Sequence, residues 1–228
     1  MLHLADAAGR VVGAPLAALA RLRRAKPMHP RGVVFPAVLE RQGIGVGVEW
    51  LDATGADDVL VRISRGAGLP ARFPDLLGFA LRVPGAPPVD LLLSSTGRGR
   101  WSRLVPVVRW DAATTYGSIM AYRTAVGPVW LSADPQGGPL PSDRDGLAAA
   151  APGRVVALSA AVGRGRWQPF ATVTLGAPAR PVDPPVHFDA VVHPPPGLVA
   201  DGPLAHFRRP AYAAARRALG ADQEAGVR

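Results

Sequence analysis

The sequence near its C-terminus is Asp201-Gly-Pro-Leu-Ala-His-Phe-Arg-Arg-Pro-Ala-Tyr-Ala-Ala-Ala-Arg-Arg-Ala-Leu-Gly220. Asp201 is a good N-cap, Gly220 is typical of the residue that follows a helix, and alanine and leucine fill the stretch between them. The pattern therefore predicts a helix. At four-residue spacing, Arg208, Tyr212 and Arg216 share one face of it.

The residues alone leave two interpretations of this face open. An unperturbed tyrosine has a pKa of about 10, and nearby positive charge favours the ionised form, so a tyrosine between two guanidinium groups suits a phenolate. The alternative is a solvated basic face with a half-buried tyrosine, which is common on helices. Pro210 weakens the case for one straight helix, because it removes a hydrogen bond to the His206 carbonyl and should kink the chain there.

Composition restricts the class of protein. The 228 residues suffice for one large domain or two small ones, and a hydrophobic content of 48% argues against disorder. No apolar run approaches the roughly 20 residues of a membrane span, so we expect no transmembrane segment. The sequence contains no cysteine, which excludes disulfides, thiolate metal sites and thiol catalysis. Because no signal-peptide pattern begins the sequence, we expect a cytoplasmic location.

The positive charge raises the question of nucleic-acid binding. The net charge is +9 and the isoelectric point is near 11.3. The basic residues are spread along the chain, with tight pairs only at 23–24, 208–209 and 216–217, and 6% aromatic residues leave little for base stacking. We therefore predict that nucleic acid is not a partner.

Most of the chain has the pattern of β-structure. Residues 1–12 are taken as an N-terminal extension, and residues 14–25 predict a short helix. Strands are predicted at 33–39, 44–49, 59–66, 75–83, 89–96, 127–132, 154–162 and 167–175. Residues 97–109 are expected to form a loop that leads to a helix, and residues 114–124 fit either helix or strand. The proline-rich residues 181–203 predict an extended arm, and residues 221–228 a frayed tail.

Several short motifs, in order along the chain, resemble catalase-related haem proteins of the small, minimal-catalase or catalase-related peroxidase type. The resemblance runs from Lys26 to Tyr212 and includes Lys26-Pro-Met-His29 with Gly32, Arg62-Ile-Ser64, Gly78-Phe-Ala80, Val89 to Thr96, Phe188-Asp189 through Gly197-Leu198, Asp201-Gly-Pro-Leu204, and Arg208-x-x-x-Tyr212.

This resemblance implies a site built around haem b. Tyr212 corresponds to the proximal ligand of the haem iron, which is a tyrosine in catalases. Arg208 would keep the Tyr212 side chain ionised as a phenolate. His29 corresponds to the distal acid–base, and Ser64 would set its tautomer and orientation.

The resemblance also implies which residues bind the propionate groups of the haem. Lys26 and Arg62 occupy positions that would bind the haem propionates, Arg62 bidentately and Lys26 as a point charge. An arginine between Val61 and Ile63 is unusual in a strand unless its head reaches solvent or an anion. Arg216 completes the cofactor-binding set.

Ser94 is the main departure from the family pattern. The family has two asparagines where this chain has Ser94 and Ser95, and the first asparagine orients peroxide over the iron. The family's usual phenylalanine over the haem face is not evident either, and Trp101, Trp110 and Tyr116 are its candidate substitutes.

The implied fold is α+β: a catalase-like closed eight-stranded antiparallel β-barrel with flanking helices and a C-terminal proximal helix. Closure would leave no strand edge unpaired. We expect one domain over residues 1–228, because the chain has no room for the nucleotide-binding C-terminal domain of larger catalases.

The implied function is that of a haem-dependent peroxidase-like or hydroperoxide-processing enzyme. Its substrate would be peroxide or an organic hydroperoxide, and dismutation of hydrogen peroxide would be weak because Ser94 replaces the distal asparagine. A non-enzymatic haem-binding or haem-sensing protein of the same fold is the alternative. A barrel that binds another apolar ligand is a third reading, against which the Arg208–Tyr212 pair, His29 and Ser64 argue. A homodimer is compatible with each of these.

Overall fold

The computed structural model describes residues 29–200, which form one compact unit. The helix expected over residues 14–25, the expected proximal helix and the expected frayed tail lie outside the described residues, as do Lys26, Arg208, Tyr212 and Arg216. A single domain over residues 1–228 therefore stays a prediction.

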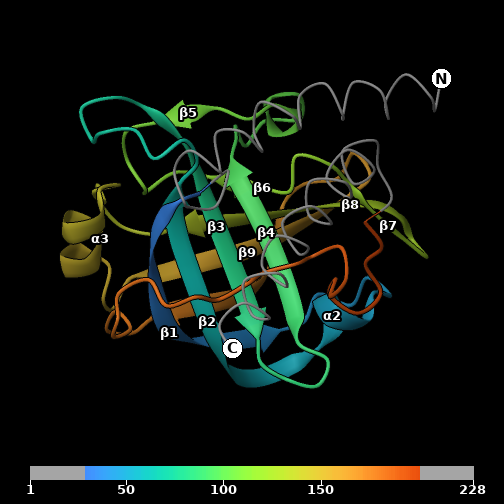
Figure 1. Cartoon of the computed structure of the whole chain (residues 1–228). Helices are drawn as coiled ribbons and strands as arrows, with labels where there is room; N and C mark the ends of the chain where they lie inside the picture. The colour runs from blue at the N-terminus through green and yellow to red at the C-terminus, as the bar shows by residue number, and fades with distance from the viewer. Residues whose placement is uncertain (1–28, 201–228) are drawn as a thin grey trace, which may run out of the picture. The chain divides into compact units, whose positions relative to one another are not determined.

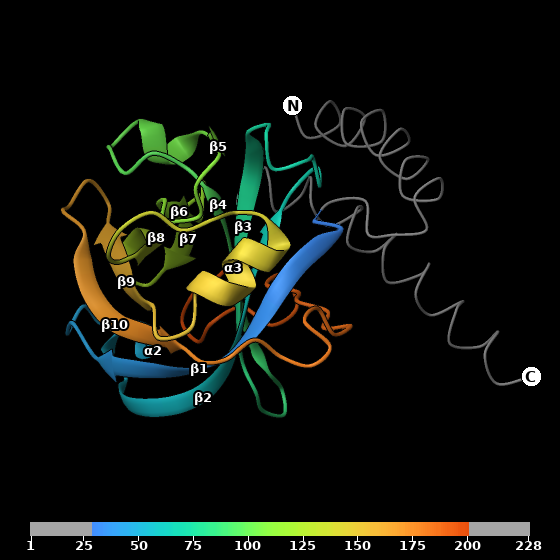
Figure 2. The same ribbon diagram turned by 90° about the vertical axis from the view of Figure 1, so that its left-hand side faces the viewer.

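Eight antiparallel strands close into a barrel (Figures 1 and 2). Around the barrel the order is β2-β1-β10-β9-β8-β6-β4-β3, and β3 pairs with β2 to close it. The closed eight-stranded barrel expected from the sequence is thus confirmed. The strands are β1 (Arg31–Gln42), β2 (Thr54–Arg65), β3 (Asp75–Val83), β4 (Val89–Ser95), β6 (Tyr116–Gly117), β8 (Gly127–Pro135), β9 (Val155–Val162) and β10 (Gln168–Leu175).

Short elements decorate this barrel. The strand β5 (Val108–Arg109) pairs with β3, and β7 (Tyr122–Thr124) pairs with β8. The helices are α2 (Glu49–Asp52), the 3₁₀ helix η1 (Ser102–Leu104) and α3 (Arg144–Ala150). The ambiguous stretch 114–124 therefore contains two short strands. Residues 97–109 contain the 3₁₀ turn η1 and the strand β5, and the helix expected to follow them does not form, since residues 110–115 are irregular. No helix within residues 29–200 is long and apolar enough to cross a membrane.

The barrel interior is the hydrophobic core. Phe35, Ile63, Phe79 and Leu93 belong to one cluster of buried side chains. Because side chains alternate between the two faces of a strand, the neighbours of these residues face the outside of the barrel. This alternation decides which of the candidate site residues can share one surface.

The strand predicted at residues 44–49 is wrong. After β1 the chain forms a loop that leads into α2, and β2 follows α2. Gly43, Gly45 and Gly47 have positive φ angles of 69°, 65° and 80°, which interrupt an extended chain. The Asp52 carboxylate then accepts hydrogen bonds from three backbone N–H groups, at residues 46–48. These bonds, with that of residue 46 the largest cause, lower the pKa of Asp52.

The proline-rich arm crosses the outer face of the barrel. It begins beside β1, where Ala179 N donates to Val34 O at 2.8 Å and Val34 N donates to the residue 182 carbonyl at 2.9 Å. Further along, Arg82 of β3 donates to His187 O at 2.5 Å. Asp90 N of β4 donates to His193 O at 2.7 Å. Residues 181–200 contain neither helix nor strand, but they are not extended throughout, because turns occur at residues 190–192 and 196–197.

The arm is held by hydrogen bonds to a partly buried ion pair, Arg82 of β3 with Asp90 of β4, and breaking this pair is expected to destabilise the protein. Asp90 is fully buried and accepts from Arg82 Nε at 2.7 Å, from Arg82 Nη2 at 2.6 Å and from Asp189 N at 2.7 Å. The hydrogen bond from Asp90 raises the pKa of Arg82. Asp90→Asn should lower the free energy of unfolding by about 3–5 kcal/mol, because it leaves the guanidinium without its charge partner. Urea unfolding measures this loss.

The matched control for Asp90→Asn is Asp57→Asn. Asp57 pairs with Arg41, but its side chain is 34% exposed, so its loss should cost less than about 1 kcal/mol. Equal losses in the two variants would show that Asp90 does not fasten the arm.

Candidate functional site

Three register partners form a row on the outer face of β2, β3 and β4. Ser64 lies opposite Gly78, and Gly78 lies opposite Ser94. Their neighbours Ile63 and Phe79 point into the core, so the row faces outward. Two hydroxyl side chains therefore flank a position that has no side chain.

The imidazole of His29 occupies the space over Gly78. A Cβ built on Gly78 would lie 2.5 Å from His29 Cε1 and 2.7 Å from His29 Nδ1. Ser64 Oγ lies 3.0 Å from the same Nδ1, within hydrogen-bonding distance. The glycine thus makes room for the ring, and Ser64 orients the ring through Nδ1. A hydroxyl can donate to or accept from that nitrogen, so either tautomer satisfies the contact.

The backbone of His29 is held in an uncommon conformation. Its φ angle is 56°, in the left-handed region that non-glycine residues seldom adopt. The His29 N–H donates to Gly66 O at 2.7 Å, and the His29 carbonyl accepts from Arg62 Nη2 at 3.1 Å. Surrounding contacts of this kind are what keep a strained backbone in place.

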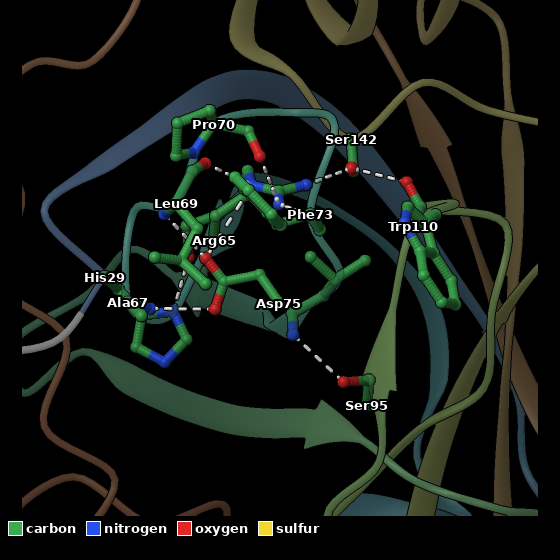
Figure 3. Close-up of polar contacts among 12 residues, drawn as sticks. His29, Arg65, Ala67, Leu69, Pro70, Phe73, Asp75, Ser95, Trp110 and Ser142 are labelled. Atoms are coloured by element: carbon green, nitrogen blue, oxygen red, sulfur yellow. Dashed lines mark hydrogen bonds and ion pairs between the residues drawn. The ribbon is translucent and has the colours of Figure 1, made fainter.

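The loop that carries Gly66 is tied down by a buried pair (Figure 3). Arg65 and Asp75 are 6% and 2% exposed, and Arg65 Nε lies 3.7 Å from an Asp75 carboxylate oxygen. Asp75 accepts from the N–H groups of Ala67 and Leu69 at 2.9 and 3.0 Å, and Arg65 Nε donates to Leu69 O at 3.1 Å. The loop therefore presents the Gly66 carbonyl to His29 from a fixed position.

The anion that Arg62 meets is a carboxylate of the chain itself. Arg62 Nε and Nη2 donate to the two oxygens of Asp183 at 2.7 and 3.0 Å. Asp183 also accepts from Gly32 N at 2.8 Å, and the guanidinium packs over Gly32, where a Cβ would lie 2.8 Å from Cζ. Arg62 thus links the arm to the carbonyl of His29.

The structure brings together four of the residues singled out from the sequence. His29, Ser64 and Ser94 lie on or over the same outer row, and Arg62 joins them through the His29 carbonyl. Ser94 is half-buried. Lys26, Arg208, Tyr212 and Arg216 lie outside the described residues, so their roles stay predictions.

Two other residues named in the sequence interpretation belong to the interior. Ser95 accepts from Leu77 N at 2.9 Å and donates to Val107 O at 2.7 Å. Tyr116 is fully buried, its hydroxyl donates to Ala112 O at 2.9 Å, and burial raises its pKa. Tyr116 therefore cannot cover an outer-face site. Of the other two candidates, Trp101 is 74% exposed and Trp110 is 62% exposed.

Sequence reasoning missed Asp183 and Gly66. A signal for Asp183 existed, because it is the first acidic residue after Asp145 and stands among prolines. An acidic residue in an arm that contains no Lys or Arg needs a cationic partner from elsewhere when the arm packs. No sequence signal distinguished the carbonyl of Gly66.

Comparison with known proteins supports the fold. No family model matches the sequence, and no curated protein matches it. Among solved structures, the chain is similar to a fungal catalase, with a TM-score of 0.59 and 11% identity over 82% of this chain and 58% of that one. It is also similar to catalase A from Saccharomyces cerevisiae, with a TM-score of 0.59 and 11% identity over 88% of this chain and 63% of that one.

These likenesses establish a catalase-like fold. The chain spans about three-fifths of the length of either catalase. On that fold, the outer row under His29 brings together Ser64, Gly78 and Ser94.

Proposed function

We propose that the protein is a haem-dependent peroxidase-like or hydroperoxide-processing enzyme on its catalase-like barrel. The observation that carries this proposal is the imidazole of His29, held over Gly78 with Nδ1 3.0 Å from Ser64 Oγ. A histidine whose ring is held in place through Nδ1 leaves Nε2 for general acid–base catalysis near neutral pH.

The described residues fit one side of a haem. Beside Gly78 on the outer face, Ala80 and Leu92 are register partners and half-buried, so they give the imidazole a small, apolar neighbouring wall. Such a wall suits a flat apolar macrocycle. Bound haem would supply oxidation and reduction at its iron. The resemblance assigns the iron ligand to Tyr212, with Arg208 as the group that keeps it ionised.

Arg62 can serve a propionate only in part. Its Nε and Nη2 are taken by Asp183, so a propionate would reach the guanidinium through Nη1 or by displacing Asp183. The resemblance assigns the further propionate contacts to Lys26 and the remaining cofactor contact to Arg216.

His29 would move one proton between the two oxygens of a bound peroxide. With Nδ1 directed to Ser64, the other ring nitrogen, Nε2, is the atom that takes the proton from one oxygen and returns it to the other. The O–O bond breaks as the second oxygen leaves as water or, from a hydroperoxide, as an alcohol, and the two electrons that this cleavage requires would come from the haem. Ser94 lies one strand beyond Gly78 and would offer a rotating hydroxyl in place of a fixed amide.

The second candidate is a non-enzymatic haem-binding or haem-sensing protein. The observation that favours it is Ser94, because loss of one positioned donor commonly costs about 10²–10³ in rate. An enzyme would turn over peroxide slowly but measurably, whereas a sensor would only change its affinity for ligands.

Haem binding through Tyr212 is tested by the absorption spectrum of the purified protein. After haem-supplemented expression, wild type should bind one haem b and show a phenolate–ferric spectrum. Tyr212→Phe should lose that spectrum or most of its haem, because phenylalanine cannot ligate iron. Tyr122→Phe, which alters a tyrosine of β7, should keep both.

Two outcomes would contradict this prediction, one the assignment of the ligand and the other the binding of haem. An unchanged spectrum in Tyr212→Phe would remove the ligand assignment alone. A wild type that takes up no haem would remove the proposed function.

A further inference from the structure

Two loops at one end of the barrel are joined to each other. One precedes β5 and contains η1, and the other is the turn between β9 and β10; they lie side by side (Figure 2). Trp167 Nε1 donates to Arg98 O at 2.9 Å, and Arg103 Nη2 donates to Gly163 O at 3.0 Å. We call residues 98–105 and 163–167 together the basic tip.

A buried arginine stiffens the basic tip. Arg103 is 5% exposed, and its guanidinium carbon lies 4.0 Å from the ring centre of Trp130 and 5.7 Å from that of Trp167. Burial and, secondarily, Arg100 lower the pKa of Arg103. Because Arg103 contacts both rings and donates to Gly163 O, it holds the two loops together as one preorganised surface.

The basic tip carries positive charge with little compensation. Arg98, Arg100, Arg164 and Arg166 are exposed. The sequence has no Asp or Glu between residues 90 and 111, or between residues 145 and 183. The ion pair found for these four arginines within residues 29–200 joins Arg98 to Asp134 at 3.8 Å, with the Arg98 side chain 52% exposed. The surface should therefore attract anions.

Apolar side chains stand among these arginines. Trp101, Leu104 and Val105 are 74%, 40% and 55% exposed. Arg100 lies against the Trp101 ring, 5.5 Å from its centre. Large apolar groups exposed together on one loop mark an interaction surface more often than scattered single ones do.

The combination favours a lipid surface over other anionic partners. Tryptophan and aliphatic side chains enter the boundary between headgroups and acyl chains, while arginines remain at the phosphates. A nucleic acid would stack on Trp101 but would leave Leu104 and Val105 in water. The chain's own ends have the wrong charge to cover the tip: residues 1–28 contain five basic and one acidic residue, and residues 201–228 contain five and three.

We propose that the basic tip docks the protein on membranes rich in anionic phospholipid. Trp101, Leu104 and Val105 enter the interface, and the exposed arginines contact lipid phosphates. Attraction to an anionic leaflet falls off within a Debye length, so the docking is salt-dependent. This docking neither requires nor supports the proposed peroxide chemistry, which lies on the outer row under His29.

The test is co-sedimentation of the full chain with vesicles. Wild type should bind vesicles of phosphatidylglycerol and phosphatidylcholine in equal parts at least about tenfold more tightly than vesicles of phosphatidylcholine alone. Arg100→Glu/Arg164→Glu/Arg166→Glu should lose about a hundredfold or more of this binding, since each basic residue near an anionic surface contributes about fivefold.

A matched control separates the basic tip from net charge. Arg72→Glu/Arg144→Glu/Arg180→Glu changes the net charge by the same amount at exposed arginines elsewhere. It should lose less than about threefold in binding. Trp101→Ser/Leu104→Ser should lose about tenfold or more while the charge is unchanged.

Four results would overturn the proposal. They are absence of wild-type binding, equal losses in the two charge variants, wild-type binding by Trp101→Ser/Leu104→Ser, and tighter binding of a single-stranded oligonucleotide than of anionic vesicles at the same salt. Circular dichroism of each variant checks that the barrel remains folded.

Discussion

His29→Ala is expected to lower peroxide turnover by about 10²–10⁴-fold while the protein keeps its haem. In the proposed function the imidazole carries the proton between the two peroxide oxygens, and alanine has no group that can replace it. The resemblance places the iron ligand at Tyr212, so cofactor content should not fall with His29. Steady-state assays of dismutation and of reductant oxidation, each normalised to bound haem, measure the effect.

Gly78→Ala tests the same assignment without removing the histidine. Its Cβ would lie 2.5 Å from His29 Cε1 and 3.2 Å from Ser64 Oγ, so the imidazole must leave its place over the row. We expect a loss that approaches that of His29→Ala. Gly138→Ala is the control, because a Cβ there meets nothing within 4 Å.

Full turnover in His29→Ala with haem loaded would remove His29 as the acid–base. Full turnover in Gly78→Ala alone would show that the position over the row is not the working one. The pH dependence of turnover distinguishes a catalytic from a structural role of His29. The part of the wild-type pH–rate profile that is due to titration of the imidazole should be absent in His29→Ala.

The barrel could be predicted from the sequence because its signals are local. Apolar alternation and turn residues mark the strands, and β1, β2, β3 and β4 appear close to where the pattern places them. The failure at residues 44–49 has an equally local cause. Their alternation of apolar residues and glycine matches a strand, but left-handed glycines and the capping carboxylate of Asp52 favour a loop.

The sequence could predict which residues belong to the site, but not the hydrogen bonds and ion pairs that connect them. His29, Ser64 and Ser94 were singled out by a motif pattern, and the strand register places them together. That Arg62 meets Asp183, 121 residues away, depends on where the arm crosses the barrel. Burial of Tyr116 was equally hidden, because a two-residue strand has no periodicity from which its inward face can be read.

Ser94→Asn is expected to raise the rate of hydrogen peroxide dismutation by about 10²–10³-fold. In the resembled family an asparagine orients peroxide at this position, and one positioned donor in such a site is worth about 2.7–4 kcal/mol of barrier. Both register partners of Ser94, Gly78 and Gly117, are glycines, so an asparagine there meets no side chain from either partner. The space over Gly78 itself is taken by the His29 imidazole. Ser94→Ala, which has no donor, should show no gain.

The gain should depend on His29, because an oriented peroxide still needs a proton carrier. In the double variant Ser94→Asn/His29→Ala, turnover should fall to that of His29→Ala, so the two changes are not additive. If the protein is a haem carrier or sensor, both substitutions should alter only the affinity for iron ligands such as cyanide. A flat rate across wild type, Ser94→Asn, His29→Ala and the double variant, all with haem loaded, would exclude the catalytic interpretation. A gain in Ser94→Asn that survives loss of His29 would instead move the acid–base to another residue.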